Sequence, residues 1–257
     1  MGIVNVTPDS FSDGGQYFDP ARALEHAQAL IEEGADILDI GCESTRPGAP
    51  EVSVEEELRR VLPLIEALAD SGVPLSVDTS KPAVMRAALA AGAVIINDVR
   101  ALQEPGALDV VVASDCGVVL MHMQGTPRTM QQAPQYTDVV TEVAQFLNAR
   151  LQAVMQHGVA AQRVVLDPGF GFGKSAEHNL TLLAQLGALD LPAPLLVGWS
   201  RKSTLGQITG RAAGERVHAS VAAALLAVER GAAIVRVHDV AAMRDALRVL
   251  QAMRSYL

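Results

Sequence analysis

The sequence predicts an α/β protein that folds as one (β/α)8 TIM barrel. Its 257 residues suffice for a single barrel, whereas two average domains would need a longer chain. Short apolar runs alternate along the chain with segments of helical periodicity, and no linker interrupts them. The runs are continuously apolar, which is typical of parallel strands buried on both faces. We therefore expect one domain over residues 1–257, with an open doubly wound sheet as the alternative.

Eight apolar runs are expected to form the strands of this barrel. Their spacing is close to that of a βαβ unit, in which a helix separates two parallel strands. Eight such units in one domain favour a barrel over an open sheet. In chain order the predicted strands cover residues 2–6, 36–40, 75–77, 94–98, 118–122, 164–167, 195–197 and 234–237.

The helical segments between these strands have recognisable ends. Asp19 and Pro20 predict the N-cap and first residue of the first helix, which Gly34 ends. Ser53 and Glu56 have the spacing of a capping box. Further helices are expected over residues 82–92, over residues 137–158 as the longest, and from an N-cap at Asp239 onwards.

Composition and charge exclude several classes of protein. The chain carries 20 Lys and Arg against 29 Asp and Glu, a net charge of −9, and only 4% aromatic residues, which argues against general nucleic-acid binding. No apolar stretch approaches the roughly 18 residues of a membrane span, and the first residues do not form a secretory signal. Cys42 and Cys116 are too few for a disulfide scaffold. We expect a cytoplasmic protein without nucleic-acid or membrane partners.

Polar and ionisable residues follow every predicted strand. The C-terminal ends of the strands in such a barrel meet at one rim, where the active sites of this fold lie. Single residues also have structural interpretations: Asp78, Asn97 and Asp167 suit helix N-caps, Lys174 suits a solvated loop charge, and His122 suits a core histidine. The residues at the predicted rim are Asn5, Asp13, Arg46, Asp78, Asn97, Met121, His122, Asp167, Lys174, Lys202, Arg236 and His238.

The residue types at this rim indicate two kinds of ligand group. Two carboxylates and an amide in an apolar barrel mouth can accept the N–H donors of a flat heterocycle. Arg46, Arg236 and His238 are typical partners of an anion. Asn5 brings a neutral oxygen, which suits a Mg²⁺ held mainly by phosphate. The rim therefore predicts a pocket for a nitrogen heterocycle beside a polyphosphate.

Five motifs resemble the signatures of the dihydropteroate synthases, pterin-binding enzymes of folate biosynthesis. They are NVTPDSFSDGG at residues 5–15, ESTRPG at 43–48, DPGFGFGK at 167–174, SRKS at 200–203 and RVH at 236–238. The resemblance runs from Gly2 to about Asp239. It implies a transferase that joins 6-hydroxymethyl-7,8-dihydropterin diphosphate to 4-aminobenzoate and releases 7,8-dihydropteroate and diphosphate. Mg²⁺ dependence, competition by sulfonamides and a homodimer are further implications.

The resemblance also assigns roles by position. It implies catalytic roles for Asp78, Lys202, Arg46 and Asp13, the last two on loops that close over the site. The pterin ring is expected on Asp78, Asn97, Asp167, Lys202, Met121 and Arg236. The diphosphate is expected on Asn5, Arg236 and His238, with Asn5 as the Mg²⁺ contact. The 4-aminobenzoate is expected on Thr45, Pro47, Phe172, Lys202 and Ser203.

Two departures and two alternatives accompany this interpretation. Cys42 stands where the family commonly has glycine, and the chain opens directly at the first strand, so that the segment usual before it is expected to be absent. A methyltransferase on the same barrel would share the heterocycle residues but would not need SRKS or ESTRPG. A catalytically inactive pterin-binding protein should have lost charged members of the set, all of which are present.

A mechanism follows from the residue types at the rim. No activated serine or cysteine pair is evident, so a covalent intermediate on the protein is not expected. We expect the bond from the pterin methylene carbon to diphosphate to break largely before the aniline nitrogen attacks. Asp78, and to a lesser degree Asp167, would stabilise the resulting cation electrostatically.

Overall fold

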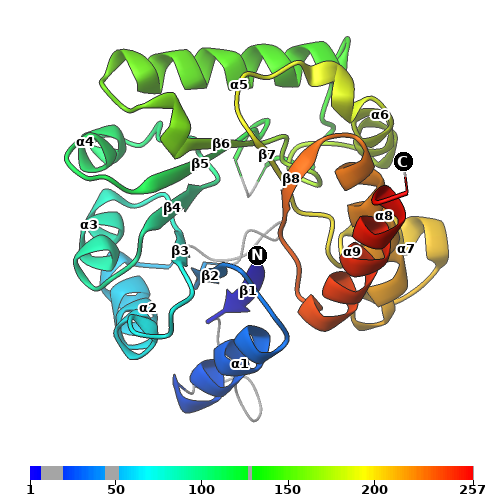
Figure 1. Ribbon diagram of the computed structural model, residues 1–257. Coiled ribbons are helices and arrows are strands. Elements are labelled where there is room, and N and C mark those ends of the chain that lie inside the picture. The colour runs from blue at the N-terminus through cyan, green and yellow to red at the C-terminus, as the bar shows by residue number, and fades with distance from the viewer. Residues whose placement is uncertain (7–19, 44–51, 127–128, 257) are drawn as a thin grey trace.

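The computed structural model describes residues 1–6, 20–43, 52–126 and 129–256 of the chain, in which strands and helices alternate. The strands lie at the centre and the helices surround them (Figure 1). The strands are β1 (Gly2–Asn5), β2 (Leu38–Gly41), β3 (Leu75–Asp78), β4 (Ile95–Asp98), β5 (Gly117–Met121), β6 (Val164–Asp167), β7 (Leu195–Val197) and β8 (Ala232–Val235). All eight lie where the apolar runs predict them, with ends shifted by at most two residues.

The α-helices of the described residues cover the outside of the sheet (Figure 1). They are α1 (Pro20–Glu32), α2 (Val54–Leu68), α3 (Pro82–Ala90), α4 (Ala107–Val112), α5 (Val139–Gln156), α6 (Ala176–Ala184), α7 (Ser203–Thr209), α8 (Val217–Glu229) and α9 (Val240–Arg254). Three short 3₁₀ helices, η1 (Ala161–Arg163), η2 (Leu186–Leu189) and η3 (Ala213–Glu215), lie in the connections. No helix in these parts of the chain is long and apolar enough to cross a bilayer.

The strands form one curled parallel sheet of the TIM-barrel type. They are paired in chain order from β1 to β8, which excludes the doubly wound alternative because that fold reverses its strand order at a switch point. The first and last strands are not joined by a ladder. Instead they meet at a single parallel bridge between Gly2 and Val237. There the Ile3 N–H donates to the Val237 carbonyl at 3.0 Å, and the Val237 N–H donates to the Met1 carbonyl at 3.0 Å.

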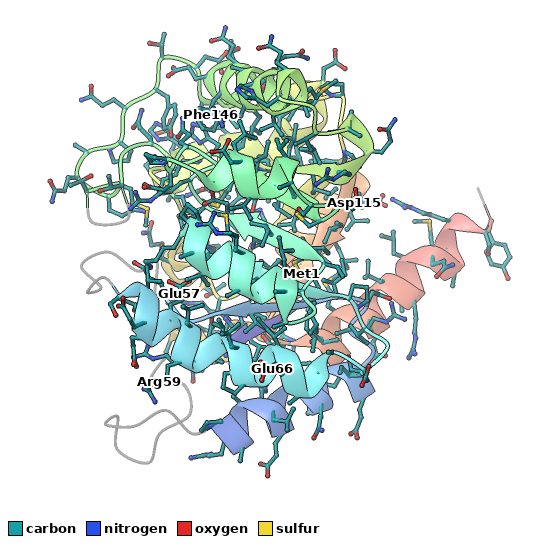
Figure 2. The ribbon with its side chains drawn as sticks, turned by 90° about the vertical axis from the view of Figure 1, so that its left-hand side faces the viewer. Met1, Glu57, Arg59, Glu66, Asp115 and Phe146 are labelled. Atoms are coloured by element: carbon teal, nitrogen blue, oxygen red, sulfur yellow. The ribbon has the colours of Figure 1, made fainter. Side chains whose placement is uncertain are left out.

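A small apolar cluster fills the inside of the sheet and forms the floor under the rim. It joins residues that come from seven different strands or directly precede them. Successive residues of a strand point to opposite faces, so the residue two positions after each floor residue faces the same interior, one layer closer to the rim. The floor consists of Met1, Ile37, Ile95, Val119, Val165, Leu196 and Ile234. Figure 2 shows the molecule from the side, with Met1 among the strands and Phe146 on α5 outside them.

Two of the predicted helix caps form differently from the sequence pattern. Ser53 is the N-cap of α2 and its hydroxyl accepts the Glu56 N–H at 3.2 Å, but the Glu56 carboxylate accepts from Arg59 at 2.7 Å instead of completing a capping box. Asp239 occupies the N-cap position of α9 without a side-chain cap bond. Its carboxylate is taken by Arg201 in an ion pair of 2.5 Å. In both helices the carboxylate pairs with a nearby guanidinium, whose full positive charge attracts it more strongly than a backbone N–H does.

Candidate active site

The candidate site is the layer of polar side chains directly above the apolar floor. Floor residues Ile95, Val165 and Ile234 are followed two positions later by site residues. These are Asn97, Asp167 and Arg236, from the ends of β4 and β6 and from directly after β8. Asp78 is the register partner of Asn97, and Met121 that of Asp167. The parallel register therefore brings residues far apart in the sequence to one end of the sheet.

Asp39, in the middle of β2, accepts hydrogen bonds from side chains of β3, of β4 and of the residue directly after β8. It is fully buried. One carboxylate oxygen accepts the Arg236 Nε–H at 2.5 Å and the Asn97 Nδ2–H at 3.0 Å. The other oxygen accepts the hydroxyl of Ser76 at 2.5 Å. The sequence analysis missed Asp39 because it lies inside an apolar run rather than after one. Its position two residues after floor residue Ile37 is the signal that points to it.

Asp78 and Arg236 form the second ion pair of the layer. The Arg236 Nη2 donates to the Asp78 carboxylate at 3.0 Å. Burial raises the pKa of Asp78 to about 7, although the charge of Arg236 opposes the shift. The neighbouring position on β2 is Gly41, where a Cβ would lie 3.0 Å from the Cβ of Asp78. A glycine at this position therefore leaves room for the Asp78 side chain.

Asp167 and Lys202 lie on the opposite part of the layer. The Asp167 carboxylate accepts the Gly169 N–H at 2.7 Å, and burial raises the pKa of Asp167. Burial, followed by the charge of Arg236, lowers the pKa of Lys202 to about 8, while the charges of Asp167 and Asp78 oppose this shift. The Lys202 ammonium lies 4.2 Å from the centre of the Phe172 ring, a cation–π distance. The Lys202 ammonium therefore lies close to an aromatic ring and within the electrostatic reach of two carboxylates.

The connection from β6 to α6 is held in place by a buried lysine. Lys174 is only 2% exposed, and its ammonium donates to the carbonyls of Gly169 at 2.9 Å and Phe172 at 3.1 Å. A third contact of 2.8 Å joins it to Nδ1 of His122. Burial lowers the pKa of Lys174 to about 7, and burial together with the Lys174 charge lowers that of His122 to about 2. His122 is thus a neutral core residue, whereas Lys174 is not a solvated loop charge.

Glycines in this connection are required by close backbone approach. Gly169 has φ +68°, and a Cβ there would lie 1.9 Å from the His122 carbonyl oxygen. Gly173 has φ +60°, and a Cβ there would lie 2.5 Å from the Gln124 carbonyl oxygen. Both conformations and both contacts exclude a side chain. The glycine-rich run therefore serves chain packing beside the site.

The connections after β7 and β8 are bonded to each other. The Ser200 hydroxyl accepts the backbone N–H of His238 at 3.1 Å and lies 2.9 Å from its Nδ1. Arg201, at φ +58°, pairs with Asp239 through Nε at 3.1 Å and Nη2 at 2.5 Å. Burial, with the charges of Arg201 and Arg236, lowers the pKa of His238 to about 3. His238 is therefore neutral and is fixed next to the loop that carries Lys202.

A second charged cluster lies beside α2. The Lys81 ammonium donates to the Glu57 carboxylate at 2.6 Å and also to Glu43. Glu57 is fully buried on α2, and Figure 2 shows it at the same end of the helix as the exposed Arg59. Cys42 is buried nearby, and its thiol has a pKa above the usual range because of burial and the charge of Glu57. This agrees with Cys42 as an unreactive filler.

Three other predicted site residues lie at the end of a strand or at the start of a helix. Asn5 is half-buried at the end of β1, Met121 is buried at the end of β5, and Ser203 is exposed as the first residue of α7. Asp13, Thr45, Arg46 and Pro47 lie outside the described residues. The described members of the pterin and diphosphate sets come from the C-terminal ends of strands or from the connections that follow them, and Lys202 lies directly before α7.

Comparison with known proteins gives a consistent result. The family model described as "Pterin binding enzyme" matches residues 1–238. The dihydropteroate synthase of Neisseria meningitidis serogroup B is 56% identical, over 98% of this chain and 92% of the relative. The Xanthomonas albilineans dihydropteroate synthase solved with 4-aminobenzoic acid is 57% identical, with a TM-score of 0.93 over 98% of this chain and 92% of that one. The Burkholderia cenocepacia enzyme solved with 7,8-dihydropteroate is 55% identical, with a TM-score of 0.91 over 99% and 91%.

Proposed function

Because the chain belongs to the pterin-binding enzymes and, among them, to the dihydropteroate synthases, we propose that it condenses 6-hydroxymethyl-7,8-dihydropterin diphosphate with 4-aminobenzoate. The products are 7,8-dihydropteroate and diphosphate, a step of folate biosynthesis. The observation that carries this proposal is the polar layer itself, in which two carboxylates, an amide, a lysine and an arginine share one buried space. Relatives solved with 4-aminobenzoic acid and 7,8-dihydropteroate support the same reaction.

The pterin ring is assigned to the centre of this layer. Asp78 and Asp167 would accept its N–H groups, and Asn97 and Lys202 would complete the polar contacts around the ring edge. Met121 and Arg236 would pack on the two faces of the ring. Burial raises the pKa values of both Asp78 and Asp167. N–H donors from a bound ring stabilise the ionised carboxylates and would lower both pKa values.

The diphosphate is assigned to the residues on the rim side of the pterin. Arg236 supplies a cation, His238 supplies a neutral ring N–H, and Arg46 would add a second cation. Among the described residues, no group of three or more His, Cys, Asp or Glu side chains could hold a metal ion. A single neutral oxygen from Asn5 at the end of β1 fits Mg²⁺, which commonly keeps few protein ligands and binds substrate phosphates. When bound, the ion would neutralise charge on the diphosphate leaving group.

The 4-aminobenzoate is assigned to the space between the β6–α6 and β7–α7 connections. Phe172 would pack on its ring, while Lys202 and Ser203 would lie at its polar ends. Thr45 and Pro47 would complete this pocket. The Lys174 contacts to the Gly169 and Phe172 carbonyls keep Phe172 in position. The Lys202 ammonium over the Phe172 ring links the two substrate pockets.

The reaction is substitution at the pterin methylene carbon. The carbon–oxygen bond to diphosphate breaks first, and its electron pair leaves with diphosphate toward Arg236 and His238. The Asp78 carboxylate stabilises the cation that delocalises into the ring, and Asp167 contributes less. The aniline nitrogen then forms the new bond and loses a proton to solvent. Arg46 and Asp13 are assigned to the loops that exclude water during this step.

The subunit arrangement and cellular location are also part of the proposal. Helices α8 and α9 pack together and expose Leu226, Val249 and Met253, with Val249 71% exposed. Exposed apolar residues on adjacent helices suit an interface between two copies, so we assign a homodimer through this face. Light scattering coupled to gel filtration tests this assignment. Two free buried cysteines fit a reducing cytoplasm.

Product identification tests the proposed function. The purified protein is incubated with the pterin diphosphate, 4-aminobenzoate and Mg²⁺, and the mixture is analysed by mass spectrometry. A mass of 7,8-dihydropteroate that forms only with both substrates is expected. Lys202→Ala serves as the matched variant and should yield far less product. Hydrolysis of the pterin diphosphate without incorporation of 4-aminobenzoate would refute the assignment.

A further inference from the structure

Asp39 contacts two residues of the proposed pterin pocket, Asn97 and Arg236. Its oxygens are all used by protein donors: Ser76 on one oxygen, Asn97 and Arg236 on the other. The side chain is fully buried. A carboxylate removed from water is unfavourable unless donors surround it. Three side chains therefore donate to the Asp39 carboxylate, although no role in the proposed reaction has been assigned to it.

The contact to Asn97 determines which way its side-chain amide faces. A carboxylate paired with an arginine has acceptors only, so the amide must direct Nδ2 to Asp39, as the 3.0 Å contact shows. The Asn97 carbonyl oxygen then faces away from Asp39, toward the ring space. Asn97 consequently offers an acceptor to a ligand, whereas the reverse orientation would offer a donor.

The contact to Arg236 fixes the plane of the guanidinium. Asp39 accepts from Nε at 2.5 Å and Asp78 accepts from Nη2 at 3.0 Å. Two carboxylates on different strands, β2 and β3, thus hold two nitrogens of one planar group. A guanidinium held at two nitrogens keeps its face in one orientation, which is what stacking on a flat ring needs.

We propose that Asp39 is a positioning residue for recognition of the pterin ring. It acts through two other side chains: it fixes Asn97 as a hydrogen-bond acceptor and Arg236 as a flat stacking surface. The ligand class this selects is a planar heterocycle whose edge presents N–H donors to three acceptors, Asp78, Asn97 and Asp167. This inference rests on the proposed function and names the residue that prepares its pocket.

Asp39→Ala is the primary variant, and Ser76→Ala is its matched control. Ser76→Ala also removes a bond from the Asp39 carboxylate, but it leaves the Asn97 and Arg236 contacts in place. Binding of 6-hydroxymethylpterin is measured by calorimetry for both variants and for the wild type. We expect Asp39→Ala to lower the affinity for 6-hydroxymethylpterin about 10- to 100-fold, the range for loss of buried charge-assisted contacts. Ser76→Ala should lower this affinity by less than about 3-fold.

Steady-state kinetics separate positioning from general damage to the fold. Asp39→Ala should raise KM for the pterin diphosphate and leave KM for 4-aminobenzoate within about 2-fold, because Asp39 contacts neither Phe172 nor Lys202 in the described hydrogen bonds.

The outcomes distinguish failure of the proposed function from failure of the role proposed for Asp39. If the wild type does not bind 6-hydroxymethylpterin, the proposed function fails and the inference fails with it. If the wild type binds and Asp39→Ala binds equally well, only the inference is overturned. Equal losses in Asp39→Ala and Ser76→Ala would also overturn it.

Discussion

Replacing Asp78 by Asn isolates the electrostatic part of the proposed mechanism. The asparagine keeps the shape of the side chain, and its carbonyl oxygen can still accept the Arg236 Nη2–H that Asp78 accepts at 3.0 Å. Arg236 also keeps its second partner, Asp39, at 2.5 Å. The variant therefore loses a negative charge while the surrounding contacts persist. We expect most of the pterin affinity to remain and turnover to fall.

The size of the fall can be worked out from the position of the charge. A carboxylate about 5 Å from a forming cation, at an effective dielectric constant of about 20, stabilises it by about 3 kcal/mol. That energy corresponds to a rate loss of more than about 100-fold, within the roughly 10²- to 10⁴-fold range expected for one strong electrostatic contribution. Single-turnover kinetics measure this step without product release.

Asp98→Asn is the control for this experiment. Asp98 is also a buried carboxylate at a strand end, but it accepts from Ser80 and from the backbone N–H groups of Arg100 and Leu102, outside the ring space. It should reduce stability and leave turnover within about 3-fold. An unchanged single-turnover rate in Asp78→Asn, or an equal loss in Asp98→Asn, would refute the electrostatic role of Asp78.

Three further predictions test other parts of the site. Ring affinity should rise with pH up to about 7, because protonation of Asp78 below its pKa of about 7 removes an acceptor. It should fall above about 8, because Lys202 then loses its proton. Calorimetry across a range that extends below the first pKa and above the second would contradict this if affinity were constant. Lys202→Ala and Ser203→Ala should lower the affinity for 4-aminobenzoate more than the affinity for the pterin, as measured by calorimetry. Equal losses of affinity for the two substrates would show that the pockets are misassigned. Lys174→Met should lower the free energy of unfolding by about 1–3 kcal/mol, because two buried carbonyls lose their donor; an unchanged midpoint in chemical denaturation would contradict this.

The sequence predicts the strands well because each is a short, continuously apolar run. It also predicts which residues gather at the rim, because the parallel register carries every strand end to the same place. Asp78 and Asn97 are register partners for this reason, although they lie 19 positions apart in the sequence. The roles of these residues stay predictions until ligands are bound.

Three residues show where sequence reasoning stops. Asp39 lies within an apolar run, so only the alternation of inward and outward faces relates it to the site. Asp239 has the position of a helix cap, yet Arg201, 38 positions away, takes its carboxylate. Lys174 has the composition of a loop charge, and its burial depends on His122, 52 positions away. In each case a partner distant in the chain decides the outcome, and local patterns do not identify distant partners.

The most direct test of the central claim is a crystal structure of the protein with 6-hydroxymethylpterin bound. The account predicts the ring above the apolar floor, between Met121 and Arg236, with its N–H edge directed at Asp78, Asn97 and Asp167. A ring bound elsewhere, or bound in the same space with its N–H edge turned away from these three acceptors, would contradict the account.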